Sequence, residues 1–255
     1  VCSMSALVIL GDSAAAGVGD QVDEGIFKGW GHYLFKAMPT MREYHNLSRP
    51  GARVSEMATT QLELALSIKP KVAIFIIGGN DVLRNNFNPK MMYKELAEAT
   101  KKLKAIDCDV YGMNLHDPSR IIPLPKVLKK VLQRRVFAVN KVYKALEDRY
   151  NLKLLDISEI EEVYDKQIWH VDRMHPSKKG HQHLAKNFRK ILLDEIAVAP
   201  VRISPVHVKT RKESISWMLL KGTPWFFKRC FDLLPAVLFL ITKEKILNAF
   251  SGRRG

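Results

Sequence analysis

A serine, a histidine and an aspartate in this sequence have the types and the spacing that nucleophilic catalysis requires. Ser13 stands in the turn Gly11-Asp12-Ser13, directly after an apolar run, and His175 follows Asp172 by three residues. Near neutral pH a histidine can take the proton of a serine hydroxyl, and a carboxylate can hold the imidazole in one tautomer. These three side chains therefore indicate attack by a serine on a carbonyl carbon.

Two further segments can supply hydrogen-bond donors to the oxyanion that such an attack creates. Gly51 stands in a turn after a short β-like run, and glycine lets a backbone N–H approach a ligand closely. Asn80, within a Gly-Gly-Asn-Asp run, carries an amide that can donate to a developing negative charge. Each segment alone is explained as well by a simple turn, and Ser13 alone by a helix N-cap.

The elements that must position these residues alternate along the chain. Alternation of this kind predicts a parallel sheet with helices on both faces, which is a three-layer α/β/α sandwich with five central strands. Ligands of such sheets bind outside the carboxyl ends of the strands, where all four segments are expected. The predicted strands span residues 5–10, 44–48, 72–77, 109–114 and 152–157, and the predicted helices 54–68, 89–106, 127–150 and 177–196.

On these four segments the chain resembles the SGNH hydrolase superfamily, also called the GDSL esterases and lipases. The resemblance covers about residues 5–196 and implies a flavodoxin-like fold. The matching segments are Gly-Asp-Ser-Ala-Ala-Ala-Gly-Val-Gly from Gly11, Arg-Pro-Gly-Ala ending at Ala52, Gly-Gly-Asn-Asp from Gly78 and Asp-Arg-Met-His-Pro-Ser from Asp172.

The resemblance also implies a role for each matching residue. Ser13 would be the nucleophile, and His175 the general base and then the acid, oriented by Asp172. The backbone N–H groups of Ser13 and Gly51 and the side chain of Asn80 would form the oxyanion hole. The neighbouring aspartates at positions 12 and 81 are expected to make hydrogen bonds within their loops.

The resulting hypothesis is a serine esterase or lipase that forms an acyl-enzyme and acts on lipid-like or acylated substrates. An acyltransferase, in which an alcohol replaces water, uses the same residues and stays open. A non-catalytic binding module is disfavoured because a dead site has no chemical reason to keep all five residues. No cofactor or metal is predicted. The acyl chain length depends on the loops at 19–30 and 115–125, whose geometry the sequence does not give.

Charge and aromatic residues divide the chain into a catalytic domain, residues 1–200, and a C-terminal helical extension, residues 201–255. The net charge is +15, and the extension holds 11 Lys or Arg against 3 Asp or Glu. Aromatic side chains beside basic ones in residues 214–250 suit an anionic membrane surface. Packing on the core domain or on a second copy explains the pattern equally well. Nucleic acid is not expected, because no RNA- or DNA-binding signature is present.

The sequence contains no uninterrupted run of about 20 apolar residues, so a membrane-spanning helix is not expected. No signal peptide is visible at its start. The chain begins with Val rather than Met, which leaves room for an upstream segment. A cytoplasmic or membrane-peripheral location is expected. The three cysteines, Cys2, Cys108 and Cys230, do not form a disulfide framework, and Cys108 is expected to be buried.

Overall fold

Five parallel strands form the central sheet of the protein, seen here in a computed structural model that describes residues 5–23, 26–122, 124–193, 196–203 and 242. The strand order is β4-β1-β5-β6-β7, so that β1 lies inside the sheet and its carboxyl end is flanked on both sides. The predicted fold class is confirmed. The strands are β1 (Ala6–Gly11), β4 (Glu43–Asn46), β5 (Val72–Ile76), β6 (Asp109–Met113) and β7 (Lys153–Leu155).

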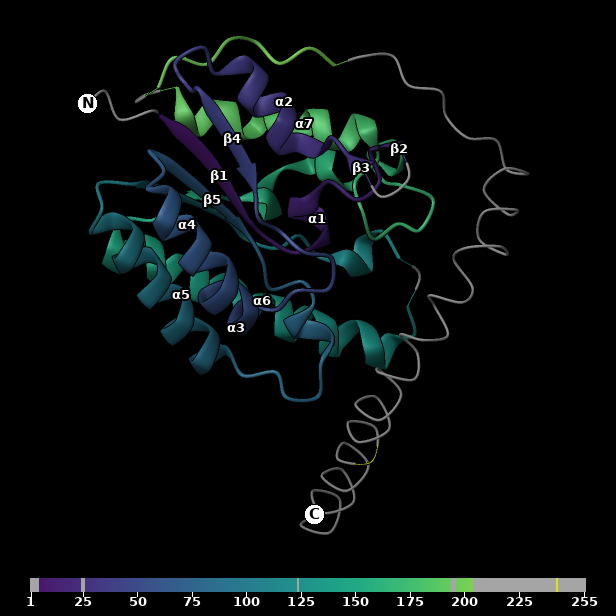
Figure 1. Ribbon diagram of the computed structural model, residues 1–255. Helices are drawn as coiled ribbons and strands as arrows, with labels where there is room; N and C mark the ends of the chain where they lie inside the picture. The colour runs from purple at the N-terminus through teal and green to yellow at the C-terminus, as the bar shows by residue number, and fades with distance from the viewer. Residues whose placement is uncertain (1–4, 24–25, 123, 194–195, 204–241, 243–255) are drawn as a thin grey trace.

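Helices cover both faces of the sheet (Figure 1). The short helices α1 (Ser13–Ala16) and α3 (Val54–Glu56) each begin in a loop that leaves the carboxyl edge. One face carries α2 (Gly29–Ala37) and α7 (Lys178–Leu192). The other face carries α4 (Leu62–Ile68), α5 (Pro89–Lys104) and α6 (Lys126–Tyr150).

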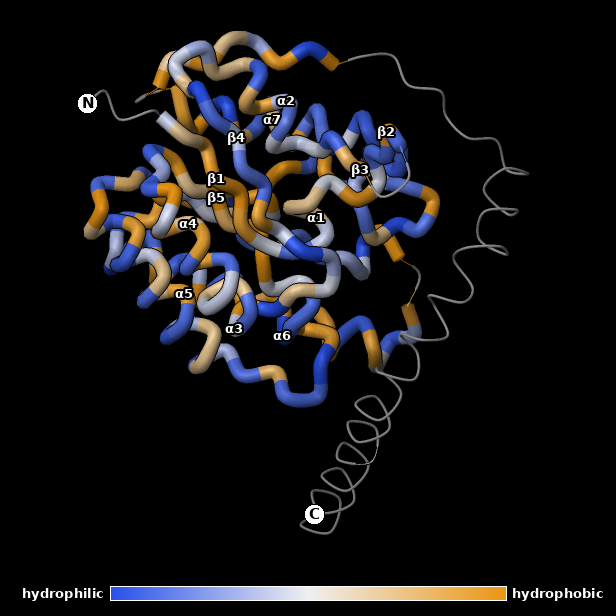
Figure 2. Tube along the Cα trace, viewed as in Figure 1, coloured by the Kyte–Doolittle hydropathy of each residue, from blue (hydrophilic) through white to orange (hydrophobic). Residues whose placement is uncertain are grey.

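Strand β1 shows why the sheet is covered on both sides. Leu7 and Ile9 pack toward α2 and α7, whereas Val8 and Leu10 pack toward α4, α5 and α6. Side chains alternate between the faces of a strand, so a strand that is apolar at every position must be buried on both. Figure 2 shows strands β1 and β5 as mostly hydrophobic, between helices that mix hydrophilic and hydrophobic residues.

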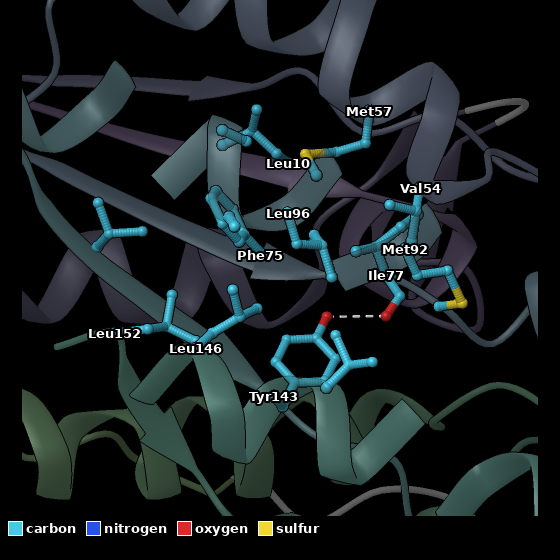
Figure 3. Packing of buried hydrophobic residues seen from close by; sticks show 14 of the residues in the cluster. Leu10, Val54, Met57, Phe75, Ile77, Met92, Leu96, Tyr143, Leu146 and Leu152 are labelled. Atoms are coloured by element: carbon cyan, nitrogen blue, oxygen red, sulfur yellow. Dashed lines mark hydrogen bonds between the residues drawn. The ribbon is translucent and has the colours of Figure 1, made fainter. Parts of the chain in front are cut away.

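The larger core cluster also fixes the end of a strand (Figure 3). Tyr143 of α6 is fully buried, and its hydroxyl donates a 2.8 Å hydrogen bond to the carbonyl of Ile77. Burial raises the pKa of this phenol, so it stays a neutral donor. Ile77 immediately precedes the Gly-Gly-Asn-Asp run, and α6 therefore anchors the start of that loop.

The four helices predicted before residue 200 are present, with three differences from the prediction. The predicted helix 54–68 contains a π-helical turn, η1 (Met57–Gln61), between α3 and α4. The segment 19–30, which was expected to be a loop, holds the antiparallel hairpin of β2 (Gln21–Asp23) and β3 (Ile26–Phe27). The hairpin strands are too short to show an alternation of polar and apolar residues. Helix α2 was not predicted either, because its two glycines weaken the helical signal of its sequence.

Several predictions fall where the structure gives no description. The C-terminal extension lies outside the described residues except for residues 201–203 and 242, and Cys2 and Cys230 lie outside them too. Cys108 is buried, as expected. Within the described part of the chain, no helix is both long and apolar enough to cross a bilayer.

Candidate active site

The turn that carries Ser13 is fixed by a glycine, a cap and a buried glutamine. Gly11 has φ 145°, and a Cβ there would lie 1.9 Å from the carbonyl oxygen of Ile76, so only glycine fits. Asp12 caps α1 by accepting the N–H of Ala14 at 3.0 Å. Gln61 accepts the N–H of Gly11 at 2.7 Å and donates to its carbonyl at 2.9 Å. The backbone before Ser13 is therefore held on both sides.

A second loop, between β7 and α7, presents His175 toward this turn. Asp172 accepts the backbone N–H of His175 at 3.0 Å and that of Met174 at 2.8 Å through Oδ1. Its Oδ2 lies 2.9 Å from Nδ1 of His175. Ser177 caps α7 directly after the loop by accepting the N–H of Gly180. The carboxylate thus orders both the backbone and the ring of the histidine.

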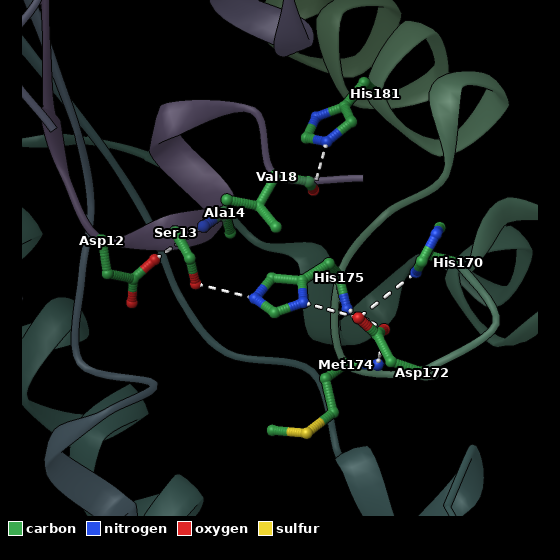
Figure 4. A network of polar contacts seen from close by, with 9 residues as sticks. All are labelled: Asp12, Ser13, Ala14, Val18, His170, Asp172, Met174, His175 and His181. Atoms are coloured by element: carbon green, nitrogen blue, oxygen red, sulfur yellow. Dashed lines mark hydrogen bonds and ion pairs between the residues drawn. The ribbon is translucent and has the colours of Figure 1, made fainter. Parts of the chain in front are cut away.

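Ser13 and His175, 162 residues apart in the sequence, meet at hydrogen-bond distance (Figure 4). Nε2 of His175 lies 2.9 Å from Oγ of Ser13. An ionised Asp172 can only accept, so we assign the ring proton to Nδ1 and leave Nε2 to accept from the serine hydroxyl. This arrangement can remove the hydroxyl proton as the oxygen attacks an electrophile.

Two carboxyl groups near this site, the buried Asp12 and the partly buried Asp172, have opposite pKa shifts. Burial alone would raise the pKa of Asp172, but its contacts with the imidazoles of His170 and His175 outweigh burial, and the pKa falls well below the usual range. His170 contributes through Nδ1, 3.3 Å from Oδ2 of Asp172. Burial raises the pKa of Asp12 to about 6, and Asp81 adds to the rise while Ala14 and His175 oppose it. Asp172 is therefore the permanently charged partner of the histidine.

Two of the three expected oxyanion donors, Gly51 and Asn80, lie in loops that contact each other. Nδ2 of Asn80 donates to the carbonyl of Ala52 at 3.0 Å, next to Gly51, whose φ is 86°. Asp81 accepts the N–H of Val54 at 3.2 Å, which ties the same two loops together. Among the described residues, no hydrogen bond joins Ser13 to Gly51 or Asn80. The structure thus links Ser13, His175 and Asp172 directly by hydrogen bonds, whereas Gly51 and Asn80 lie in two loops that are hydrogen-bonded to each other.

Sequence analysis missed three residues that support the site: Gln61, His170 and His181. His181 donates to the carbonyl of Val18 at 3.0 Å, and the N–H of Val18 donates to the carbonyl of Ser13 at 3.0 Å. Burial lowers the pKa of His181 to about 4, so it stays neutral. A polar residue at a core-facing helical position is the signal that could have found Gln61 and His181. For His170, the only signal in the sequence is its position two residues before Asp172.

The described residues contain no group of three or more His, Cys, Asp or Glu side chains placed to hold a metal ion. The chemistry that this arrangement itself supports is nucleophilic attack by an alcohol oxygen, assisted by a neutral imidazole. An acyl or a phosphoryl electrophile satisfies that description equally. Family relationships narrow the choice.

A family model described as "GDSL-like Lipase/Acylhydrolase family" matches residues 9–183, more than half of the chain. No curated protein matches. Solved structures share the fold at low sequence identity. A lipase/acylhydrolase from Enterococcus faecalis is 17% identical, with a TM-score of 0.61 over 80% of this chain and 100% of its own. The psychrotrophic esterase EstA from Pseudoalteromonas sp. is 20% identical, with a TM-score of 0.58 over 74% and 97%.

Proposed function

This chain belongs to the GDSL-like lipase/acylhydrolase family, and on that premise we propose that it hydrolyses carboxylic esters through an acyl-enzyme on Ser13. The observation that carries the proposal is the continuous path of hydrogen bonds from Ser13 through His175 to Asp172. The family supplies the carboxylic ester as the electrophile, and the path supplies the nucleophile, the base and its orienting carboxylate.

In the proposed reaction, Oγ of Ser13 attacks the ester carbonyl while Nε2 of His175 takes its proton. The imidazolium then gives that proton to the departing alcohol, and the acyl group stays on Ser13. Water attacks the acyl-enzyme in the second half, with His175 again as the base, and the carboxylic acid leaves. Asp172 stabilises the imidazolium in both halves, for which its low pKa suits it.

The proposed oxyanion donors are the backbone N–H groups of Ser13 and Gly51 and the side-chain amide of Asn80. One amide hydrogen of Asn80 is used on the carbonyl of Ala52, and the second remains for the oxyanion. The hydrogen bond to Ala52 supports the proposal because it fixes the orientation of the amide before substrate binds. Preorganised donors of this kind need no rearrangement in the transition state.

The test is turnover of p-nitrophenyl butanoate by two variants that keep the fold. We expect Ser13→Ala to lose nearly all activity, and Asn80→Ala to lose about 10²–10³ in kcat, the usual cost of one oxyanion donor. Wild-type turnover by Ser13→Ala would overturn the proposal. Product analysis with a competing alcohol separates hydrolysis from acyl transfer, because only a transferase forms the new ester at the expense of the free acid.

We also propose that the natural ester is lipid-like or acylated, and that residues 201–255 form a separate extension which brings residues 1–200 to an anionic membrane surface. The support is compositional: 11 basic residues against 3 acidic ones in the extension, interleaved with aromatic side chains. Aromatic and basic side chains together suit the boundary between headgroups and acyl chains.

A further inference from the structure

Three arginines in the loops at the carboxyl edge of the sheet are each committed to a carboxylate. In these pairs the guanidinium is neutralised locally and offers little to a substrate. The pairs are Arg49 with Glu56 at 3.1 Å, Arg53 with Asp81 at 3.4 Å and Arg120 with Glu161 at 2.9 Å.

Arg173 differs from these three. It stands between Asp172 and His175 and is exposed. Its one side-chain hydrogen bond within the described residues runs from Nη1 to the carbonyl of Ile121, at a long 3.5 Å, and no described carboxylate lies within ion-pair distance. The carboxylate of Asp172 is engaged with the two histidines instead. A guanidinium has five N–H donors, so most of those of Arg173 are available.

The backbone at this position favours glycine rather than arginine. Arg173 has φ 55°, in the left-handed region, where a residue with a Cβ is strained and glycine is not. Its N–H donates to the carbonyl of His170 at 2.9 Å, which closes the turn before His175. A glycine would close this turn without strain. The conformation of the turn therefore does not explain why an arginine stands at this position. We attribute the arginine to a role of its side chain.

We propose that Arg173 binds an anionic group, a carboxylate or a phosphate, of the ester that Ser13 attacks. A guanidinium makes two parallel hydrogen bonds to either group. Arg173 stands two positions before His175, so their Cα atoms lie within about 7 Å, and a charge on the substrate near the ester bond is within reach. The net charge of +15 further favours the approach of an anion. The inference rests on the proposed esterase function.

The test compares kcat/KM for matched neutral and anionic esters. The carboxylate arm pairs mono-p-nitrophenyl glutarate with p-nitrophenyl pentanoate, and the phosphate arm pairs butanoylglycerol phosphate with butanoylglycerol. The variants are Arg173→Gln and Arg173→Gly. The matched control is Arg42→Gln, an exposed arginine directly before β4 and so at the opposite edge of the sheet.

We expect the wild type to favour the anionic ester in at least one arm. This preference should fall on the order of tenfold in both Arg173 variants, persist in Arg42→Gln and weaken as salt is added. Arg173→Gly should melt no lower than the wild type, because glycine relieves the strained φ, which separates lost recognition from lost folding.

Two results would overturn the inference: no anionic preference in either arm, or a preference that both Arg173 variants retain. Failure of the esterase proposal is distinguishable from these. In that case none of the four esters would be turned over in a Ser13-dependent way.

Discussion

Asp12, which is buried, and Asp172, which is partly buried, show how two carboxyl groups near one histidine come to titrate differently. Asp172 accepts hydrogen bonds from the ring of His175 and from two backbone N–H groups, and the ring of His170 lies close by, so that its charged form is favoured. Asp12 accepts the N–H of Ala14, but burial dominates and raises its pKa to about 6. The sequence places both aspartates near the site, but the number of donors around each depends on loop geometry that spacing alone does not give.

The raised pKa of Asp12 makes a prediction about stability and pH. The carboxyl binds its proton more tightly in the folded state than in the unfolded state, whose pKa is about 3.8. The folded protein therefore loses stability as pH rises from about 4 to 6, and above pH 6 it carries a penalty of roughly 3 kcal/mol. Asn is an equally good helix cap, so Asp12→Asn should remove the penalty.

Urea unfolding of both proteins at pH 4 and pH 8 measures this effect. We expect Asp12→Asn to exceed the wild type in free energy of unfolding at pH 8 and to match it more closely at pH 4. Asp172 is present in both proteins, so its contribution to the pH dependence cancels in the comparison. Because its pKa is lowered by folding, that contribution stabilises the fold above the unfolded-state pKa and is lost as the pH falls below it. An Asn variant less stable than the wild type at pH 8 would contradict the assignment.

The helical segment from α3 to α4 shows what an irregular element contributes to the site. Its π-helical turn ends at Gln61, whose amide clamps both backbone groups of Gly11, two residues before Ser13. The side chain is almost fully buried. Gln61 is a polar residue on the apolar face of this helical segment. Its presence there is explained by the end of β1, whose buried backbone groups need hydrogen-bond partners.

Gln61→Leu should destabilise the fold and disturb catalysis together. It leaves the buried N–H of Gly11 without its acceptor, which costs about 1–3 kcal/mol, and it frees the turn that carries Ser13. We expect a lower free energy of unfolding and a fall in kcat that exceeds any change in KM. The neighbouring exposed Thr60 provides the control, since Thr60→Leu touches neither group of Gly11. Unchanged kcat in Gln61→Leu would refute the positioning role.

The element scale also separates what the sequence predicts from what it does not. The buried strands β1 and β5 were predictable because they are almost continuously apolar, and the four long helices because they bury one face at regular spacing. Strand β4, which reads Glu-Tyr-His-Asn and is only half-buried, carries a weaker signal. The π turn was not, because one extra residue shifts the helical phase without a compositional signal. The hairpin of β2 and β3 was missed because its three- and two-residue strands leave no periodicity.

For the candidate site, sequence order was enough to bring Ser13 and His175 to one sheet edge, because both follow strands at their carboxyl ends. Their 2.9 Å approach is supported by the hydrogen bond from His181 of α7 to the carbonyl of Val18, just after α1, and no local pattern encodes this long-range contact. The sequence pointed to Gly51 and Asn80 as residues of the site. It did not predict the hydrogen bond that joins their two loops.

On the scale of the whole molecule, the charge separates residues 201–255 from the rest. Removal of residues 205–255 should leave turnover of short soluble esters near the wild-type level and abolish binding to anionic liposomes. The reason is that the extension carries about half of the excess positive charge, while Ser13, His175 and Asp172 all lie in the sheet domain. Sedimentation with phosphatidylglycerol vesicles, with phosphatidylcholine vesicles as the control, measures the binding. Equal binding by the truncated protein would eliminate the membrane role of the extension.

The central claim is that Ser13 forms a covalent bond with the substrate, and a fluorophosphonate probe tests it most directly. The hydroxyl oxygen displaces fluoride from phosphorus, which leaves a stable phosphonyl group on the nucleophile. The account predicts one adduct per chain, located by peptide mass spectrometry on Ser13 and absent from Ser13→Ala. The folded wild-type protein would contradict the account if it stayed unlabelled, or if Ser13→Ala were labelled as fast as the wild type.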